Sequence, residues 1–244
     1  MYKGLIYIKN NNETDIKGIP ILMYHHFFDP NIGESIPKNA TSIQNWLEIS
    51  TFEKQMRYLK ENNYYFPAWD EIYEFVNSRL VLPDKSIVIT IDDSMENVFR
   101  LAIPIIYKYN IKATLFTITS RKEAALIPYY ASSNIIFESH THNMHIRDEN
   151  NMGIFLNINE EEAKKDLFKS IIIVGSNDVF CYPFGHYNDF TKKIVKDMGF
   201  KLAVTTESGS VYPGTDPLLL PRYWIRNDTT FKNFINIVNN INKM

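Results

Sequence analysis

The feature that most constrains the fold is an alternation, from residue 86 onward, of short apolar segments with longer segments of helical periodicity. The segments 86–93, 112–119 and 134–141 each contain a short run made mostly of apolar and β-branched residues. Strands buried on both faces and separated by helices are typical of a parallel sheet covered by helices. About seven such units within 244 residues indicate an α/β domain, and they favour a distorted (β/α) barrel of about seven parallel strands over an open sheet.

The same hydrophobic periodicities predict the secondary structure of the rest of the chain. Further strands are expected at 19–27, 178–185, 201–207 and 218–225, and helices at 51–63, 69–79, 95–110, 160–171, 188–200 and 229–242. Ser50 followed by Glu53 is typical of a capping box that begins the first helix. Pro104 is expected to bend its helix or to start a new turn. The Asn-rich residues 1–18 are expected to be a flexible lead-in to a single domain over 19–244.

Composition narrows the classes of partner. A net charge of −2 without a basic cluster argues against nucleic acid, whose phosphates require cationic side chains. The one cysteine, Cys181, excludes an internal disulfide. No run reaches the roughly 18 apolar residues of a membrane span, and the first residues lack the apolar core of a signal peptide. Two interpretations of the location stay open, a cytoplasmic protein and one whose targeting segment has been removed. For the oligomeric state, a monomer is the default expectation.

Residues suited to chemistry stand at the point where four of the expected strands end. They are His25 and His26, Asp92 and Asp93, His140, and the pair Phe184–Gly185. In (β/α) barrels the functional groups lie at the carboxyl ends of the strands. The sequence therefore predicts one site assembled from four distant segments.

Two of these groups have alternative interpretations. Adjacent carboxylates at a strand end point in different directions, so Asp92 and Asp93 suit a cation and a neighbouring water, although they would equally suit the cap of the next helix. His140 and His145 converge only if the chain turns between them, as Asn143 favours. Two imidazoles and one carboxylate leave open positions on a divalent cation, as a hydrolytic metal site requires. The alternative is three surface histidines in a polar loop.

Five segments resemble motifs of the polysaccharide deacetylase family (NodB homology, carbohydrate esterase family 4). In family order they are IPILMYHHF, IVITIDDSMENV, LAIPIIYKYNIKATLF, ESHTHNMH and FCYPFGHYN, and the resemblance extends over residues 19 to 226. The chain is most similar to the branch of poly-N-acetylglucosamine and cell-wall polysaccharide deacetylases, in which the second metal histidine follows the first by five positions. The resemblance implies a distorted (β/α) barrel and a divalent metal, zinc first and cobalt or nickel as alternatives.

The resemblance also implies residue roles. Asp93, His140 and His145 match the metal ligands, and Asp92 matches the catalytic base. The backbone N–H of Phe184, the aromatic residue after proline, matches the donor that stabilises the oxyanion. His142 falls at a variable position and receives no ligand role.

The chain departs from the family pattern in three places. Ser94 replaces the glycine of the usual TFDDG motif, which is expected to alter the turn after the aspartates. Cys181 stands where many members carry an arginine that orients the base; it is expected to be an inert buried thiol. Arg222 resembles a late arginine of related sequences and is a candidate substitute, with a surface ion pair as the alternative.

The late histidine that acts as general acid in many members is missing. His25 is the first candidate to protonate the leaving amine and His186 the second, with a structural role for His25 as the alternative. Tyr182 and Trp224 are candidates to stack on a sugar ring, with core packing as the alternative.

These features predict a metal-dependent hydrolase that removes acetyl groups from N-acetylglucosamine-containing polysaccharide. An extracellular or cell-surface location is implied by the resemblance alone. Two rival functions stay open: a catalytically silent carbohydrate-binding member of the same fold, and a metal hydrolase acting on another amide or ester.

Overall fold

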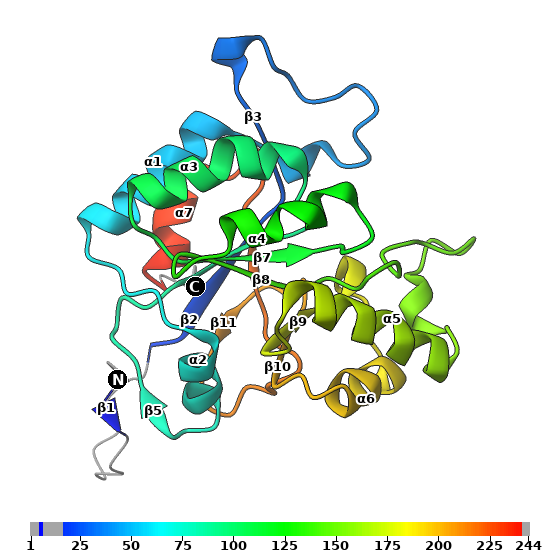
Figure 1. The fold of residues 1–244 in the computed structure, drawn as a ribbon. Coiled ribbons are helices and arrows are strands. Elements are labelled where there is room, and N and C mark those ends of the chain that lie inside the picture. Colours follow the sequence, from blue (N-terminus) through cyan, green and yellow to red (C-terminus); the bar gives the residue numbers. More distant parts are fainter. Residues whose placement is uncertain (1–4, 7–16, 241–244) are drawn as a thin grey trace.

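A computed structural model describes residues 5–6 and 17–240 of the chain. Seven parallel strands form a curled sheet with helices packed on its outer side (Figure 1). The spatial order of the sheet is β10-β9-β8-β7-β6-β2, and β12 pairs with the free side of β2. The predicted distorted (β/α) barrel of about seven parallel strands is therefore confirmed.

The parallel strands are short and almost entirely buried. They are β2 (Ile19–Tyr24), β6 (Val88–Ile91), β7 (Ala113–Thr117), β8 (Ile135–Ser139), β9 (Val179–Cys181), β10 (Leu202–Val204) and β12 (Tyr223–Trp224). One antiparallel strand, β11 (Ser210–Val211), also pairs with β2. Outside this sheet, β3 (His26–Phe28) pairs with β4 (Trp46–Glu48), and β1 (Leu5–Ile6) pairs with β5 (Leu80–Val81).

Helices lie between the strands along the chain, and the last helix follows the final strand. They are α1 (Ile49–Glu61), α2 (Trp69–Val76), α3 (Ile103–Lys108), α4 (Ile127–Tyr130), α5 (Glu160–Val174), α6 (Asp189–Asp197) and α7 (Phe231–Val238). Each long helix turns an apolar stripe to the sheet; in α1 the stripe contains Phe52, Met56 and Leu59. Helix α2 packs with residues of the inner face of the sheet, such as Ile21 and Val88.

The last strand is shorter than predicted. The backbone of Leu220 bonds to both Ala203 and Thr205, so this segment lies along β10, and pairing with β2 begins only at Tyr223. Pro221 stands between the two pairings. Because proline has no backbone N–H and cannot continue a ladder, it divides the predicted strand 218–225.

Two helix starts are informative. The predicted capping box is wrong: α1 begins at Ile49 directly after β4, and Ser50 lies inside the first turn, where its hydroxyl donates to the Glu48 carboxylate. The predicted restart at Pro104 is confirmed, because the helix 95–110 divides into a π-helical turn (Val98–Ala102) and then α3. Proline supplies no N–H to an unbroken α-helix, which accounts for the change.

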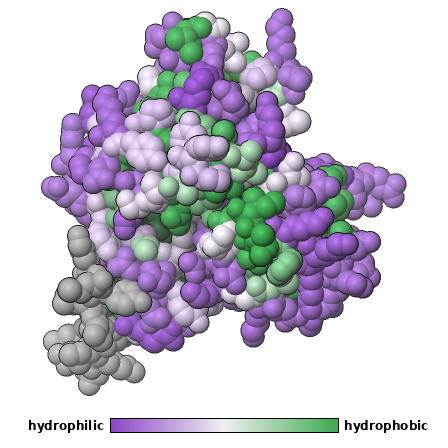
Figure 2. All heavy atoms as spheres, viewed as in Figure 1, coloured by the Kyte–Doolittle hydropathy of each residue, from purple (hydrophilic) through white to green (hydrophobic). Residues whose placement is uncertain are grey.

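Most of the predicted lead-in, residues 1–4 and 7–16, lies outside the described residues, as do the last residues of the predicted closing helix. Leu5–Ile6 form the antiparallel pair with β5. Among the helices of residues 17–240, we find none with the length and apolar character needed to cross a membrane. Figure 2 shows a mostly hydrophilic face, with some apolar side chains gathered near α5, where Phe168 and Ile172 are exposed.

Candidate active site

A cavity of about 860 Å³ lies at the carboxyl ends of the parallel strands. Its walls bring together the strand-end residues that the sequence singled out and a smaller number that it did not. The lining residues are Met23, His25, His26, Thr41, Ser42, Asn45, Asp92, Asp93, His140, His145, Arg147, Asn151, Tyr182, Phe184, Gly185, Thr206 and Trp224.

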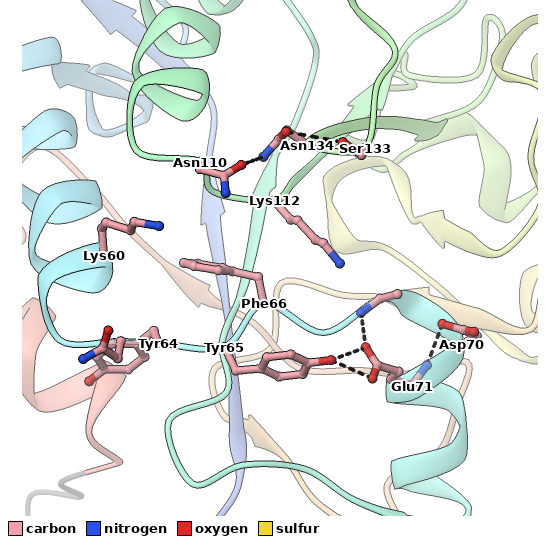
Figure 3. A pocket seen from close by; sticks show the side chains of 12 residues that line it. Lys60, Tyr64, Tyr65, Phe66, Asp70, Glu71, Asn110, Lys112, Ser133 and Asn134 are labelled. Carbon is pink, nitrogen blue, oxygen red and sulfur yellow. Dashed lines mark hydrogen bonds between the residues drawn. The ribbon is translucent and has the colours of Figure 1, made fainter. Parts of the chain in front are cut away.

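A second hollow of about 840 Å³ lies at the opposite edge of the sheet, beside the amino ends of β7 and β8 (Figure 3). Several of its polar groups are bonded to one another: Glu71 accepts from the Tyr65 hydroxyl and the Ala68 N–H, and Asn134 donates to Asn110. No histidine or cysteine lines it. Size therefore does not distinguish the two hollows, whereas the side-chain chemistry does.

Three predicted metal ligands meet in the first cavity. One oxygen of Asp93, Oδ1, lies 3.9 Å from His140 Nε2 and 3.7 Å from His145 Nε2. One ligand atom from each residue lies within 4.8 Å of the other two. Ligand atoms of a tetrahedral zinc site lie roughly 3.4 Å apart, so small side-chain rotations would bring these atoms to a shared ion.

The donor set fits a divalent cation. Asp93 Oδ1 is buried and has no hydrogen-bond partner among residues 17–240, with the Arg121 guanidinium 3.8 Å away; a bound cation would satisfy this carboxylate oxygen. His140 Nδ1 lies 2.8 Å from the Cys181 carbonyl, which can only accept, so Nδ1 carries the proton and Nε2 presents its lone pair. Burial lowers the pKa of His145 to about 3, which keeps this imidazole in the neutral form that metals bind.

The turn that follows the aspartates places two residues in the left-handed region. Asp93 has φ 69° and Ser94 has φ 47°, values that are uncommon for residues other than glycine. The buried Ser94 hydroxyl bonds to Thr117 Oγ1 at 2.8 Å and lies 3.2 Å from the Phe116 carbonyl. Ser94 thus adopts a backbone conformation that glycine favours, and its side chain forms hydrogen bonds that glycine lacks.

Asp92 lies beside this cluster in a buried ion pair. Arg222 donates to both of its carboxylate oxygens at 2.8 Å, and the Arg222 side chain is fully buried, so the surface ion pair considered for this residue is excluded. Burial alone would raise the pKa of Asp92, but the charge and hydrogen bonds of Arg222 outweigh it and hold the pKa well below its usual value. Asp92 does not cap the next helix, and it is ionised at neutral pH.

Cys181 also contacts this pair. Its buried Sγ lies 3.5 Å from Asp92 Oδ2 and 3.4 Å from the Arg222 guanidinium. Burial is the largest cause that raises the pKa of Cys181 well above its usual value, so the thiol stays protonated. Cys181 is buried as predicted, and in addition it packs against the candidate base.

The other histidines occupy distinct positions. His25 lines the cavity with Nε2 4.0 Å from Asp92 Oδ2, and burial lowers its pKa. His186 lies outside the lining, where its Nδ1 accepts from the Gly153 N–H at 3.1 Å. His142 turns to Thr119, 3.0 Å away, and is not part of the ligand cluster.

The three aromatic candidates differ in exposure. Trp224 lines the cavity and is 37% exposed, so one ring is available to a ligand. The ring of Phe184 packs on His145 at 4.1 Å between centroids, and its backbone has φ 60°. Tyr182 is fully buried and packs edge-on against Phe180, which leaves no ring face for a sugar.

The sequence interpretation gave no specific role to three basic residues near the cluster, His26, Arg121 and Arg147. His26 Nε2 lies 3.6 Å from Asp93 Oδ2, and Arg121 lies 3.8 Å from Asp93 Oδ1. The Arg147 guanidinium lies over the Phe184 ring at 4.1 Å. The position of His26 beside Asp93 could have been predicted, because β2 and β6 pair in parallel and the His-His and Asp-Asp pairs follow these strands directly. The two arginines come from loops, whose geometry the sequence does not specify.

Comparisons with known proteins point to one family. The family model for polysaccharide deacetylase matches residues 80–203, just over half of the chain. A poly-beta-1,6-N-acetyl-D-glucosamine N-deacetylase of Staphylococcus aureus (strain MRSA252) is 31% identical over 210 residues, covering 78% of this chain and 71% of that protein. The protein of the same name from Staphylococcus epidermidis is 28% identical, with 80% and 73% covered.

Solved structures share the fold. IcaB from Ammonifex degensii superposes with a TM-score of 0.76 at 22% identity, covering 91% of this chain and 97% of that one. The Streptococcus pyogenes deacetylase PplD, solved in complex with acetate, superposes with a TM-score of 0.72 at 26% identity, covering 91% and 98%. On the strength of the family model and the relative at 31% identity, the chain belongs to the polysaccharide deacetylase family.

Proposed function

We propose that this protein is a metal-dependent deacetylase that removes N-acetyl groups from N-acetylglucosamine-containing polysaccharide. The observation that carries the proposal is the meeting of Asp93, His140 and His145 in one cavity, with Asp92 beside them. An extracellular or cell-surface site of action belongs to the same proposal, because a polysaccharide of this kind would lie in the cell envelope or its surroundings.

Asp93, His140 and His145 would hold a divalent cation, most suitably zinc, since two imidazoles and a carboxylate are typical zinc ligands. Such a cation supplies polarisation of an acyl carbonyl and acidification of water. Asp92 is the proposed general base, which would take the proton from the attacking water. Arg222 would fix the direction of that carboxylate and keep it ionised.

Three further groups would act on the substrate. The backbone N–H of Phe184 would donate to the oxyanion that forms when water adds to the carbonyl carbon. His25, which lies beside Asp92 in the cavity wall, would protonate the amine as the C–N bond breaks, releasing acetate and a free amino sugar. Trp224 would stack on a sugar ring beside the acetyl group.

The substrate class rests on the relatives. The Staphylococcus proteins are named for activity on poly-beta-1,6-N-acetyl-D-glucosamine, and an exposed indole at a polar cavity suits a neutral sugar polymer.

The test is acetate release from poly-β-1,6-N-acetylglucosamine oligomers and from chitooligosaccharides, with zinc, cobalt or nickel added. Asp92→Asn should lower turnover by a factor of about 10² or more while the bound metal, counted by atomic absorption, stays at the wild-type level. Asp189→Asn, at an exposed position on α6, is the matched control and should keep full turnover. Undiminished turnover by Asp92→Asn would contradict the assigned base.

The rival functions give different results in the same assay. A silent carbohydrate-binding protein would bind the polymer without releasing acetate from any substrate. A hydrolase for other amides or esters would turn over acetyl esters and spare N-acetylglucosamine.

A further inference from the structure

Two pairs of consecutive residues face each other at the mouth of the sheet. Strands β2 and β6 pair in parallel register up to Tyr24 opposite Ile91, and the next backbone bond runs from the Asp92 N–H to the Tyr24 carbonyl at 2.9 Å. His25 therefore lies beside Asp92 and His26 beside Asp93, with Nε2–Oδ2 separations of 4.0 and 3.6 Å. Each carboxylate therefore has one imidazole from the 25–26 pair as its neighbour.

The two oxygens of Asp93 face different groups. Oδ1 faces His140 and His145, the proposed metal ligands, whereas Oδ2 faces His26. Arg121 cannot take the place of His26, because it approaches Oδ1 and the backbone carbonyl of Asp93. His26 is thus the neighbour of the oxygen that is turned away from the ligand cluster.

The His26 ring is held from its other side. His26 and Trp46 are register partners in the parallel pair β3–β4, and their rings lie 4.9 Å apart. Nδ1 of His26 is buried without a hydrogen-bond partner among residues 17–240. Because a carboxylate only accepts, the proton of a neutral His26 is best placed on Nε2, toward Asp93.

We propose that His26 is a positioning residue for Asp93: a small side-chain rotation that closes the 3.6 Å gap lets its Nε2–H donate to Oδ2, so that Oδ1 stays directed at the divalent cation. The inference rests on the proposed metal site and assigns a role to a residue outside the Asp–His–His set. Groups that orient metal ligands in this way typically change metal affinity 10- to 100-fold when removed, because the ligand must then be ordered by the metal itself.

The test compares His26→Leu, which removes the donor, with His26→Gln, whose amide keeps one. Zinc dissociation constants are measured by competition with a chromophoric chelator, and thermal unfolding is measured in excess chelator. We expect His26→Leu to raise the dissociation constant 10- to 100-fold, and His26→Gln to recover most of the affinity. His142→Leu, a histidine outside the cluster, is the matched control and should bind zinc as the wild type does.

The cobalt absorption spectrum separates positioning from direct ligation. A positioning role leaves the shape of the d–d bands of Co²⁺-loaded His26→Leu unchanged, whereas the loss of a nitrogen ligand would alter them and overturn the inference. Equal zinc affinity in His26→Leu and wild type would also overturn it while leaving the proposed function intact. A wild-type protein that binds no zinc, cobalt or nickel would overturn both. If His26→Leu does not fold, His26→Gln is compared with His26→Asn, whose amide is shorter. We then expect His26→Asn to bind zinc more weakly than His26→Gln, and equal affinities would overturn the inference.

Discussion

The buried pair of Asp92 and Arg222 yields a quantitative prediction about stability. The side chains are 4% and 0% exposed, and two charge-assisted hydrogen bonds of 2.8 Å join them. Replacing Arg222 by Met preserves most of the volume but leaves a carboxylate buried without its cation. Breaking a buried pair in this way costs about 3–5 kcal/mol, and Asp92→Asn, which strands the guanidinium, should fall in the same range.

The double variant separates the interaction free energy of the pair from the contribution of its surroundings. Asp92→Asn combined with Arg222→Met removes both charges, so its loss of unfolding free energy should be smaller than the sum of the two single losses by at least about 2 kcal/mol. Some loss remains, because the Thr90 hydroxyl and the Thr205 carbonyl lose the hydrogen bonds that Arg222 donates.

The pair also predicts a pH dependence in metal-free protein. In the wild type Arg222 holds the pKa of Asp92 below its usual value, so the stabilisation is present above about pH 4 and is lost as the pH falls through the folded pKa. In Arg222→Met burial acts without the arginine and raises the pKa of Asp92, so this carboxyl becomes protonated at mildly acidic pH. The loss caused by Arg222→Met should therefore be larger at pH 7.5 than at pH 5.

The assay is urea unfolding followed by tryptophan fluorescence in excess chelator at both pH values. A loss below about 1 kcal/mol in Arg222→Met at pH 7.5, or additive losses in the double variant, would refute the reasoning that this pair is desolvated and coupled.

Two other predictions concern the walls of the cavity. Gly185→Ala should destabilise the fold by about 2 kcal/mol or more, because φ is +73° and the new Cβ would lie 2.0 Å from Thr206 Oγ1. The control is Gly214→Ala, where φ is +88° and no atom lies within 4 Å of the new Cβ, so that it bears only the backbone strain of about 1 kcal/mol. Equal urea midpoints for the two variants would contradict the close approach at Gly185. Trp224→Ala should raise KM for oligosaccharides about 3- to 10-fold with little change in kcat if the indole stacks on sugar, whereas Tyr129→Ala, 82% exposed and outside the cavity lining, should leave KM unchanged in the same acetate-release assay.

Much of the fold was predictable because its strands are buried on both faces. Apolar runs such as Ile19–Tyr24 and Val88–Ile91 have one stable environment, a sheet covered by helices, so their pattern indicates both the strand and its neighbours. Local end signals were less dependable. Ser50 and Glu53 have the spacing of a capping box, yet β4 runs directly into α1 and places Ser50 past the helix start.

The sequence by itself determined which residues reach the mouth of the sheet, because parallel strands all end at the same edge. It thereby grouped His25, His26, Asp92, Asp93 and His140, whereas His145 was added by the family resemblance. Tertiary structure alone decided how these residues are oriented and paired. Arg222 follows Asp92 by 130 positions, and only the packing of distant segments makes it the buried partner of that carboxylate. Such contacts depend on loop paths and side-chain rotation, which are fixed by the packing of the whole chain and not by the pattern of any one segment.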